Sequence, residues 1–446
     1  MYSRIHEPHA CTLTDALREW AASRPAAPWL EDSQGIAFTV GQAFTSSQRF
    51  ASFLHHQLGV QPEERVGVFM SNSCAMVATT FGIGYLRATA VMLNTELRSS
   101  FLRHQLNDCQ LATIVVDSAL VEHVASLADE LPHLRTLVVV GDAPAAVPER
   151  WRQVAWMDSS ACAPWEGPAP RPEDIFCIMY TSGTTGPSKG VLMPHCHCAL
   201  LGLGAIRSLE ITEADKYYIC LPLFHANGLF MQLGATVLAG IPAFLKQRFS
   251  ASTWLADIRR SGATLTNHLG TTAMFVINQP PTEQDRDHRL RASLSAPNPA
   301  QHEAVFRERF GVKDVLSGFG MTEVGIPIWG AHRARCAERG RLGARGPFRD
   351  LHRRPRDRCA GAGRASGRNP GAAQGALRLH GGLPERPGEN GRGLAQPLVP
   401  HGRCRHAGRT GAYHLRGPHQ GLHPPPGREH LGHRGRGRGG PVARRP

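Results

Sequence analysis

The sequence predicts an α/β protein of stacked βαβ units over about the first three-quarters of its 446 residues. Short apolar runs of strand length alternate with segments of helical spacing, which is the pattern of parallel βαβ units. This alternation stops near His332, and Arg, Gly, Pro, His and Ala dominate from Cys336 to Pro446. We therefore divide the chain into an α/β domain over residues 1–335 and a tail over residues 336–446.

The first half of the predicted domain contains helices, strands and a linker. Thr12 is a candidate N-cap, because its hydroxyl can accept from a backbone amide of the first helical turn. The first strand leads into a helix that ends near Tyr85, and two further apolar strands flank a helical stretch. The predicted helices are Thr12–Trp20 and Val40–Leu58, the strand segments are Arg65–Ser73, Leu111–Asp117 and Leu134–Asp142, and the linker is Asp158–Pro172.

The second half of the domain repeats the pattern. The apolar run Asp174–Tyr180 is short enough for a buried strand, and a polar loop, a new apolar segment and a helix follow it. In doubly wound sheets of this kind, ligands bind at the carboxyl ends of the strands. The later predicted strands are Tyr217–His225, Ala263–Leu269 and, ending in a glycine-rich turn, Lys313–Glu323; the later predicted helices are Ser252–Arg260 and Gln301–Phe310.

Charge and cysteine content separate the two parts of the chain. Residues 336–446 contain 23 Arg, no Lys and 6 acidic residues, a net charge of +17; the whole chain carries +14, so residues 1–335 carry −3. The 11 cysteines are scattered without paired spacing, which indicates reduced thiols in a cytoplasmic protein. No run of about twenty apolar residues and no signal peptide is present, so we expect no membrane span.

The most distinctive stretch is YTSGTTGPSKGVLMPH, from Tyr180 to His195. It places three glycines, five Ser or Thr hydroxyls and one lysine between a strand and a helix. Exposed backbone amides, hydroxyl donors and a cation are groups that bind a polyphosphate. The stretch is not a Walker A loop, because no Gly-Lys-Ser/Thr follows four residues after a glycine. For a generic cluster of this composition, a flexible surface loop is the alternative interpretation.

The full string resembles the phosphate-binding loop of the AMP-forming adenylating superfamily, which includes acyl-CoA synthetases, luciferases and peptide-synthetase adenylation domains. The resemblance implies an adenylate-forming N-terminal domain that activates a carboxylate with ATP. The acyl group then passes to a thiol, usually that of coenzyme A as co-substrate. For Lys189 alone, the alternative is a solvated surface lysine. The residues expected to bind the β- and γ-phosphates are Thr181, Ser182, Gly183, Thr184, Thr185, Gly186 and Lys189.

GFGMTE, from Gly318 to Glu323, matches a second superfamily motif, an aromatic-Gly-x-Thr-Glu string. The resemblance implies that Thr322 contacts the α-phosphate and that Glu323 helps to hold Mg²⁺, a hard cation that prefers oxygen ligands. Seen alone, Thr-Glu after Gly is more typical of a helix start. The residues expected at adenine are Gly318, Phe319 and Gly320, together with Ser295, Ala296 and Pro297, where relatives often carry Gly-Ala-Pro.

LPLFHANG, from Leu221 to Gly228, matches a third segment, in which His225 lines the acyl pocket. A lone histidine is more often structural, which is the alternative interpretation for this residue. Gly202–Ala205 and Gly270–Ala273 are further candidates for the wall of that pocket. These segments do not specify the carboxylic acid or the oligomeric state.

His195-Cys196-His197-Cys198 contains four residues of metal-ligand type. Adjacent side chains point in divergent directions on a strand or a helix, and no second pair stands at a zinc-finger spacing. We therefore interpret these four residues as a helix start after the phosphate loop.

The tail has two competing interpretations. Its composition is typical of a disordered basic segment that binds nucleic acid, although it has few aromatic residues for stacking on bases. Alternatively, it is a displaced reading frame. LVPHGRC (Leu398–Cys404) can be encoded so that a start one base later reads WFHTGD. In the same way, DLHRRPRDRCA (Asp350–Ala360) permits ICIVDPETGA, and QGLHPPPGREHL (Gln420–Leu431) permits KDCIRRRGENIS.

These hidden strings resemble the segments that would come next in the superfamily, and the last is most similar to the crotonobetaine/carnitine–CoA ligase group. As it stands, the chain has His401-Gly402-Arg403 where the ribose-binding Thr-Gly-Asp is expected, and it has no lysine after Lys313. The superfamily uses a lysine of a small C-terminal domain in adenylation. We therefore predict impaired ligase activity, with a non-catalytic nucleotide-binding protein as the alternative.

Overall fold

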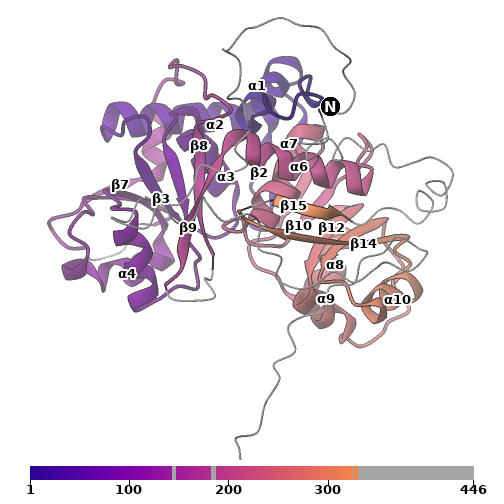
Figure 1. The fold of residues 1–446 in the computed structure, drawn as a ribbon. Helices are drawn as coiled ribbons and strands as arrows, with labels where there is room; N and C mark the ends of the chain where they lie inside the picture. Colours follow the sequence, from indigo (N-terminus) through magenta and orange to yellow (C-terminus); the bar gives the residue numbers. More distant parts are fainter. Residues whose placement is uncertain (143–146, 182–186, 324, 330–446) are drawn as a thin grey trace, which may run out of the picture. The chain divides into compact units, whose positions relative to one another are not determined.

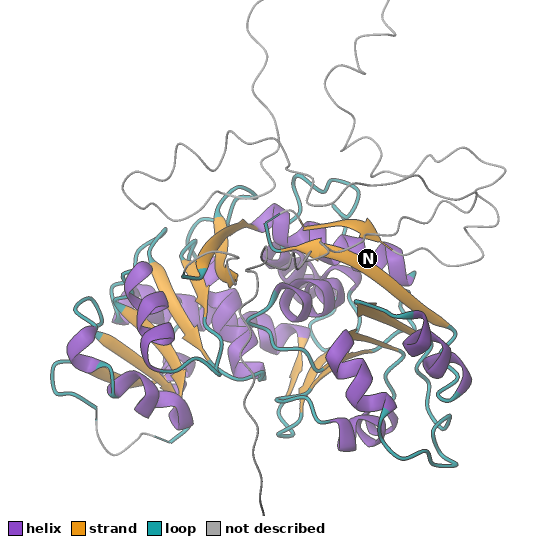
Figure 2. Ribbon diagram, turned by 60° about the horizontal axis from the view of Figure 1, so that its bottom comes forward, coloured by secondary structure: helices purple, strands orange, loops and turns teal. Residues whose placement is uncertain are grey.

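The computed structural model describes residues 1–142, 147–181, 187–323 and 325–329. It confirms the α/β class, because these residues form two mostly parallel sheets with helices packed against them (Figure 1, Figure 2). The predicted disorder of residues 336–446 lies outside the described residues. Within the described part, no helix is long and apolar enough to cross a membrane.

The first sheet has seven strands in the order β7-β6-β5-β3-β4-β8-β9. All neighbours are parallel except β8 and β9, which form an antiparallel hairpin. Parallel sheets are buried on both faces, which explains why β3 and β5 are nearly continuous apolar runs. The strands are β3 (Arg65–Phe69), β4 (Thr89–Met92), β5 (Thr113–Asp117), β6 (Thr136–Val140), β7 (Arg152–Ala155), β8 (Ile175–Thr181) and β9 (Lys189–Pro194).

The second sheet has eight strands in the order β15-β14-β13-β12-β10-β11-β1-β2. Its inner pairs are parallel, and its two outermost pairs, β14–β15 and β1–β2, are antiparallel. The N-terminal hairpin thus completes a sheet built mainly from residues after 216. The strands are β1 (Pro28–Asp32), β2 (Ala37–Thr39), β10 (Tyr217–Ile219), β11 (Ala243–Leu245), β12 (Leu265–Leu269), β13 (Ala292–Ala296), β14 (Asp314–Met321) and β15 (Gly325–Trp329).

The helices begin where the sequence supplies caps. Before α1, Thr12 Oγ1 accepts from the backbone N–H of Asp15 at 3.0 Å, which confirms the predicted N-cap. Before α2, Thr39 and Gln42 form a capping box. The α-helices are α1 (Leu13–Ser23), α2 (Val40–Ser52), α3 (Cys74–Tyr85), α4 (Ser99–Asp108), α5 (Val121–Ala125), α6 (His195–Leu209), α7 (Ala235–Ala239), α8 (Ala251–Ser261), α9 (Gly270–Ile277) and α10 (Ala300–Glu308). Phe53–Gln57 and Asn227–Gly234 are π-helical, and Ser118–Leu120, Ala128–Glu130 and Trp156–Ala161 are 3₁₀ turns.

Three clusters of buried apolar side chains form the core. The largest contains residues of both sheets and of α1, α2, α3 and α6, so it lies between the sheets. The second packs α4 and α5 on the outer face of the first sheet, and the third packs α8, α9 and α10 on the outer face of the second. β10 shows this division, because Tyr217 and Ile219 belong to the central cluster and Tyr218 to the outer one.

One predicted strand is shorter in the structure. β10 ends at Ile219, whereas the prediction extends to His225. The Asn72 side chain takes over the backbone groups beyond the strand, donating to the carbonyl oxygen of Leu221 at 3.0 Å and accepting from the N–H of Leu223 at 2.8 Å. A side chain distant in sequence therefore replaces the sheet ladder there.

Another predicted strand is longer. The expected glycine-rich turn after Lys313 is instead the second half of β14, which continues to Met321 because β15 pairs with it in antiparallel fashion. The helix expected at Val40–Leu58 becomes π-helical at Phe53. The expected linker Asp158–Pro172 begins within a 3₁₀ turn.

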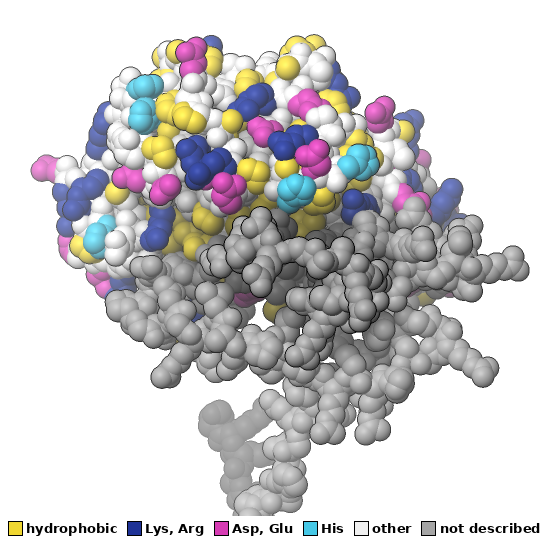
Figure 3. Space-filling model, turned by 45° about the horizontal axis from the view of Figure 1, so that its top comes forward, with side chains coloured by type: hydrophobic (Ala, Val, Ile, Leu, Met, Phe, Trp, Pro, Cys, Tyr) yellow, Lys and Arg dark blue, Asp and Glu magenta, His cyan; other side chains and the backbone are white. Residues whose placement is uncertain are grey.

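The surface of the described part is mixed in charge. On the face shown in Figure 3, the described Lys and Arg side chains lie among Asp and Glu side chains rather than in a patch of one sign. This agrees with the net charge of −3 carried by residues 1–335. A face of mixed sign lacks the basic stripe that typically binds a nucleic-acid backbone.

Candidate functional site

The hairpin of β8 and β9 holds both ends of the predicted phosphate loop. Thr181 and Lys189 face each other in its last antiparallel pair, so the backbone enters and leaves the loop at neighbouring points. Thr181 is half-buried, whereas Lys189 is exposed to solvent. The remaining predicted phosphate ligands lie outside the described residues; they are Ser182, Gly183, Thr184, Thr185 and Gly186.

Helix α4 and the residue after it contact the hairpin on β8 and just before β9. On β8, the Tyr180 hydroxyl donates to Asp108 Oδ2 at 2.8 Å and lies 3.1 Å from Cys109 Sγ. On the other side, His104 Nε2 lies 2.9 Å from the carbonyl oxygen of Ser188. Burial, with Cys109 and Asp108 alongside, raises the pKa of Tyr180, so the phenol remains a donor. The two ends of the phosphate loop, at Thr181 and Lys189, are therefore held in place.

The structure brings the second motif to the phosphate hairpin. β14 carries Gly318–Met321 to the side where the parallel strands end, which we call the carboxyl edge, and Thr322 and Glu323 follow in a turn. The Thr181 hydroxyl donates to Glu323 Oε1 at 3.3 Å. Two predicted site residues that are 142 positions apart therefore meet. The side chain of Phe319 lies outside the described part.

The residues predicted at adenine share the carboxyl edge on two neighbouring strands. Ser295 on β13 is paired with Ser317 on β14, so that Gly318 follows directly alongside. Ala296 is the last residue of β13, and Ser295 Oγ donates to the carbonyl oxygen of Pro297 at 3.1 Å. The strand pairing thus brings together two sequence segments that were predicted to act together.

His225 lies in the segment that follows β10, two places from β13 in the sheet order. Its side chain is exposed, and its ring packs edge-on against Phe224 with 4.6 Å between ring centroids. Burial of part of the ring lowers the pKa of His225. The structure therefore places this residue on the carboxyl edge, but no hydrogen bond among the described residues joins it to Glu323.

Sequence reasoning missed a chain of buried polar groups beside His225. The Tyr217 hydroxyl donates to Asn267 Oδ1 at 2.7 Å, and Asn267 Nδ2 donates to Asn227 Oδ1 at 2.7 Å. Gly228 follows, and a Cβ there would stand 2.4 Å from the carbonyl oxygen of Pro222, so only glycine fits. The FHANG segment is thus held by contacts that no local pattern indicates.

The predicted helix start at His195–Cys198 is confirmed, because α6 begins at His195. Sequence reasoning missed what His197 does in that turn. This side chain is buried, and its Nε2 lies 3.1 Å from the carbonyl oxygen of Thr322. The two residues are 125 positions apart, which explains why no motif spacing predicted the contact.

The described residues limit how a metal could be held. Among them, no group of three or more His, Cys, Asp or Glu side chains could bind a metal ion together. Glu323 and Thr181 supply hard oxygen donors of the kind that Mg²⁺ prefers. They fit a Mg²⁺ ion that takes its other ligands from phosphate oxygens and water. His195 does not fit a ligand role, because its ring is buried and packs against Phe176 with 4.8 Å between centroids.

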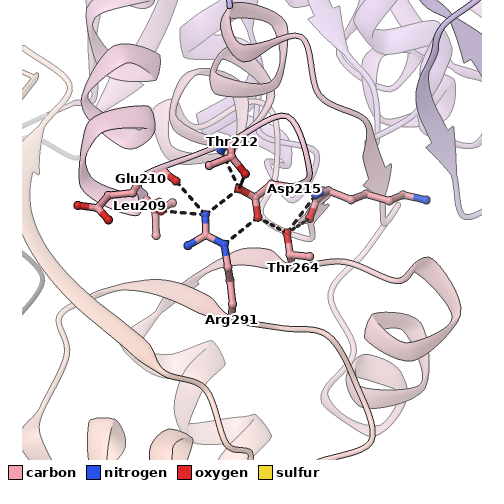
Figure 4. Close-up of polar contacts among 7 residues, drawn as sticks. Leu209, Glu210, Thr212, Asp215, Thr264 and Arg291 are labelled. Carbon is pink, nitrogen blue, oxygen red and sulfur yellow. Dashed lines mark hydrogen bonds and ion pairs between the residues drawn. The ribbon is translucent and has the colours of Figure 1, made fainter.

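A buried ion pair closes the opposite side of the second sheet, where the parallel strands begin, which we call the amino edge. Asp215 accepts from Arg291 at 2.8 and 2.7 Å, and Arg291 also donates to the carbonyl oxygens of Leu209 and Glu210 at the end of α6 (Figure 4). Burial raises the pKa of Asp215, but the hydrogen bonds from Arg291 outweigh it, and the pKa is lowered overall.

The first sheet has a similar pair at its amino edge. Asp174 precedes β8, and its Oδ2 accepts from Arg87 Nε at 2.8 Å. Arg171 also donates to this carboxylate through its backbone and its guanidinium. Burial raises the pKa of Asp174, but these hydrogen bonds lower it overall to about 2. Both amino edges therefore carry a carboxylate that is held in its charged form.

Comparisons with known proteins identify the family of this chain. The family model described as AMP-binding enzyme matches residues 17–350. The long-chain fatty acid transport protein 6 of Mus musculus is 26% identical over 309 residues, which are 69% of this chain and 50% of that protein. The medium/long-chain-fatty-acid–CoA ligase FadD17 of Mycobacterium marinum is 30% identical over 280 residues, which are 62% of this chain and 52% of that protein. The chain spans about half the length of these curated relatives.

A solved structure has the same arrangement. The anthranilate CoA ligase AuaEII, in complex with anthranoyl-AMP, aligns with a TM-score of 0.67 and 26% identity. The alignment covers 74% of this chain and 63% of that one.

Proposed function

Because the chain belongs to the AMP-binding enzyme family, whose model matches residues 17–350, we propose that it is the adenylate-forming part of an AMP-forming carboxylic acid–CoA ligase. The observation that carries this proposal is the 3.3 Å hydrogen bond from Thr181 to Glu323. It joins the phosphate hairpin of the first sheet to the motif strand of the second. This contact supports the proposal, because it joins two segments that the same resemblance assigned to ATP.

In the proposed reaction, a carboxylate oxygen attacks the α-phosphorus of ATP, and the bond to the β-phosphate oxygen breaks to release pyrophosphate. The thiolate of coenzyme A then attacks the acyl carbon, and AMP leaves. Charge develops on the phosphate oxygens during the first step, so fixed donors and a cation lower its barrier. Lys189 supports this role because it stands exposed at the mouth of the hairpin.

We propose the following division of roles at the carboxyl edge. Thr322 contacts the α-phosphate, and His225 faces the carboxylate. Glu323 would hold Mg²⁺, which when bound supplies positive charge to the phosphates. The β- and γ-phosphates are bound by Thr181, Ser182, Gly183, Thr184, Thr185, Gly186 and Lys189. Adenine lies among Ser295, Ala296, Pro297, Gly318, Phe319 and Gly320.

For the acyl group, we propose a small polar carboxylate of the crotonobetaine or carnitine kind. The displaced-frame string KDCIRRRGENIS supports this class. The half-buried Asn227 adds support, because it places a side-chain amide two residues after His225, and Asn267 binds the oxygen of that amide. An alkyl chain cannot hydrogen-bond such groups, and burying them against it would be costly.

We further propose that residues after about 335 are translated from a displaced frame and replace the distal part of the adenylate-forming domain and a small C-terminal domain. The residues that follow Leu431 add to the earlier strings. GHRGRGRGGPVAR (Gly432–Arg444) permits GTEVEAVVAR when it is read one base later. The first string alternates arginine and glycine, whereas the second has apolar residues at helical spacing. Sequencing the coding DNA between residues 329 and 351 tests this; codons that cannot yield these strings one base later would overturn it.

The enzymatic proposal is tested with the chain as given and with the same gene after frame restoration. We expect Mg·ATP to bind both proteins, and we expect robust ATP–pyrophosphate exchange with crotonobetaine or carnitine only from the restored one. Octanoate serves as the apolar comparison acid. Absence of Mg·ATP binding by both proteins would overturn the proposal, and full exchange by the given chain would show that no lysine after Lys313 is needed.

A nucleotide-binding protein without ligase turnover is the second candidate. It is favoured by the absence of any lysine after Lys313 and by His401-Gly402-Arg403 at the expected ribose site. Mg·ATP binding without exchange, before and after frame restoration, would support it. Nucleic-acid binding ranks below both, because the described face in Figure 3 is mixed in charge and the basic tail after Cys336 has few aromatic residues for stacking on bases.

A further inference from the structure

The turn between β14 and β15 contains the residues on which the proposed ATP site depends, yet it lies beyond the strand ladder. The last pair of that ladder joins Met321 to Gly325, and Thr322 and Glu323 are in the turn itself. A turn held only by its own strands has several accessible conformations, which ordering must overcome. The position of the Glu323 carboxylate therefore needs support from elsewhere.

His197 supplies a hydrogen bond to this turn. Its Nε2 lies 3.1 Å from the Thr322 carbonyl oxygen, and the side chain is 2% exposed. A carbonyl oxygen only accepts, so Nε2 must carry the hydrogen and donate. Because the His197 ring is buried, Nε2 could not readily replace this bond with one to water, so losing it would carry a cost.

The helix that carries His197 is itself fixed to the phosphate hairpin. α6 follows β9 without a break at Pro194. Its first two backbone N–H groups, those of His195 and Cys196, donate to the carbonyl oxygens of Asp174 and Pro172 at 3.0 Å each. With these two amides bound, the His197 side chain makes the contact from the first turn of α6 to the turn between β14 and β15.

We propose that His197 is a positioning residue that sets Thr322 and Glu323 against the phosphate hairpin and thereby determines the affinity for Mg·ATP. The inference rests on the proposed function, since it assigns ATP to this site. His197 acts through the Thr322 peptide and does not itself touch the nucleotide. This positioning role requires one N–H donor at the position of His197 Nε2.

Three substitutions in the full-length chain separate this role from general packing. His197→Leu removes the donor. His197→Gln keeps an N–H donor at a similar reach, so it should restore function. His195→Leu is the matched control, because His195 lies in the same buried turn and its ring nitrogens have no hydrogen-bond partner among the described residues.

Titration with Mg·ATP is the first measurement. We expect His197→Leu to weaken binding about tenfold, His197→Gln to remain within about threefold of the parent, and His195→Leu to bind like the parent. Urea unfolding of the same proteins without nucleotide shows whether weaker binding merely follows lower stability. Equal affinity of His197→Leu and the parent, or equal losses in all three variants, would overturn the inference.

Amide hydrogen exchange of the nucleotide-free proteins is the second measurement, and it does not depend on ATP. His197→Leu should accelerate exchange at residues 318–323, and His197→Gln and His195→Leu should not. If the parent fails to bind Mg·ATP but exchange behaves as expected, the proposed function fails and the positioning contact stands. Unchanged exchange in His197→Leu would refute the positioning contact itself.

Discussion

The two edges of the sheets use polar residues in opposite ways. At the amino edge, Asp174 and Asp215 are each enclosed by arginine hydrogen bonds, and Asp215 is 3% exposed. At the carboxyl edge, Lys189 is exposed, and Glu323 accepts a long hydrogen bond, at 3.3 Å, from Thr181. The first arrangement satisfies its charges internally, whereas the second leaves them available to a ligand.

This difference teaches where stability and function reside in the fold. A buried carboxylate that loses its arginine becomes an uncompensated charge, so substitutions at the amino edge should destabilise the whole domain. Charged groups that face solvent contribute little to stability. Substitutions at the carboxyl edge should therefore change ligand affinity with little change in the free energy of unfolding.

The largest expected effect is that of Arg291→Ala. Removing this guanidinium leaves Asp215 buried without its partner, and we expect a loss of about 3–5 kcal/mol in the free energy of unfolding. Urea unfolding at neutral pH measures it. Arg248→Ala is the control, since the Arg248 side chain is 84% exposed, and it should change stability by less than about 0.5 kcal/mol. A loss below about 1 kcal/mol in Arg291→Ala would remove the distinction between the two edges.

Lys189→Ala should lower the affinity for Mg·ATP and leave the free energy of unfolding nearly unchanged, the reverse of Arg291→Ala. We expect Mg·ATP affinity to fall about 10- to 100-fold, because a charge-assisted contact to phosphate is lost. Stability should change by less than about 0.5 kcal/mol, since the residue is exposed. Lys313→Ala, at another exposed lysine, is the matched control in the same calorimetric titration. Equal affinities of the two variants would contradict the assignment of the hairpin.

The amino edge of the first sheet should be sensitive to acid. The pKa of Asp174 is lowered from 3.8 to about 2, so its stabilising contribution is present above pH 4 and is lost as the pH falls towards 2. The contribution is about 2 kcal/mol. Asp174→Asn should remove it at neutral pH and flatten the dependence of unfolding midpoint on pH in that window. Glu173→Gln is the control, because the Glu173 side chain is 69% exposed; a steep acid dependence retained in Asp174→Asn would argue against this pair as its source.

Thr264→Val should have the smallest effect. The Thr264 hydroxyl donates to Asp215 at 2.7 Å and accepts from the backbone N–H of Lys216 at 3.0 Å. Valine has nearly the same shape but neither function, so we expect a loss of about 1 kcal/mol. Differential scanning calorimetry can resolve it. A variant as stable as the parent would show that Arg291 and Thr212 satisfy the carboxylate without the Thr264 hydroxyl.

Much of this fold is predictable from local sequence. Thr12 caps its helix as expected, and the apolar runs around Val66 and Val115 are strands, because caps and buried parallel strands depend on nearby residues. The phosphate loop and the GFGMTE segment were also predicted as site segments. Their sequence strings are long, and the contact between Thr181 and Glu323 agrees with a shared site.

The remaining features depend on distant partners. β14 runs through glycines that suggest a turn, because β15 supplies the pairing. β10 stops early, and Asn72, from the segment after β3, binds the backbone groups of Leu221 and Leu223 beyond its end. His197 was interpreted as part of an ordinary helix start, since its partner Thr322 is contributed by another strand. No local pattern contains these contacts.

The length of helix α6 sets the distance between contacts at its two ends. Its first turn carries His197, and its last carbonyl oxygens are bound by Arg291, so both ends are fixed to different edges of the second sheet. Its 15 residues span about 22 Å. Inserting or deleting one residue inside it would rotate one end against the other by about 100°. The length of α6 is therefore as constrained as the side chains at its ends.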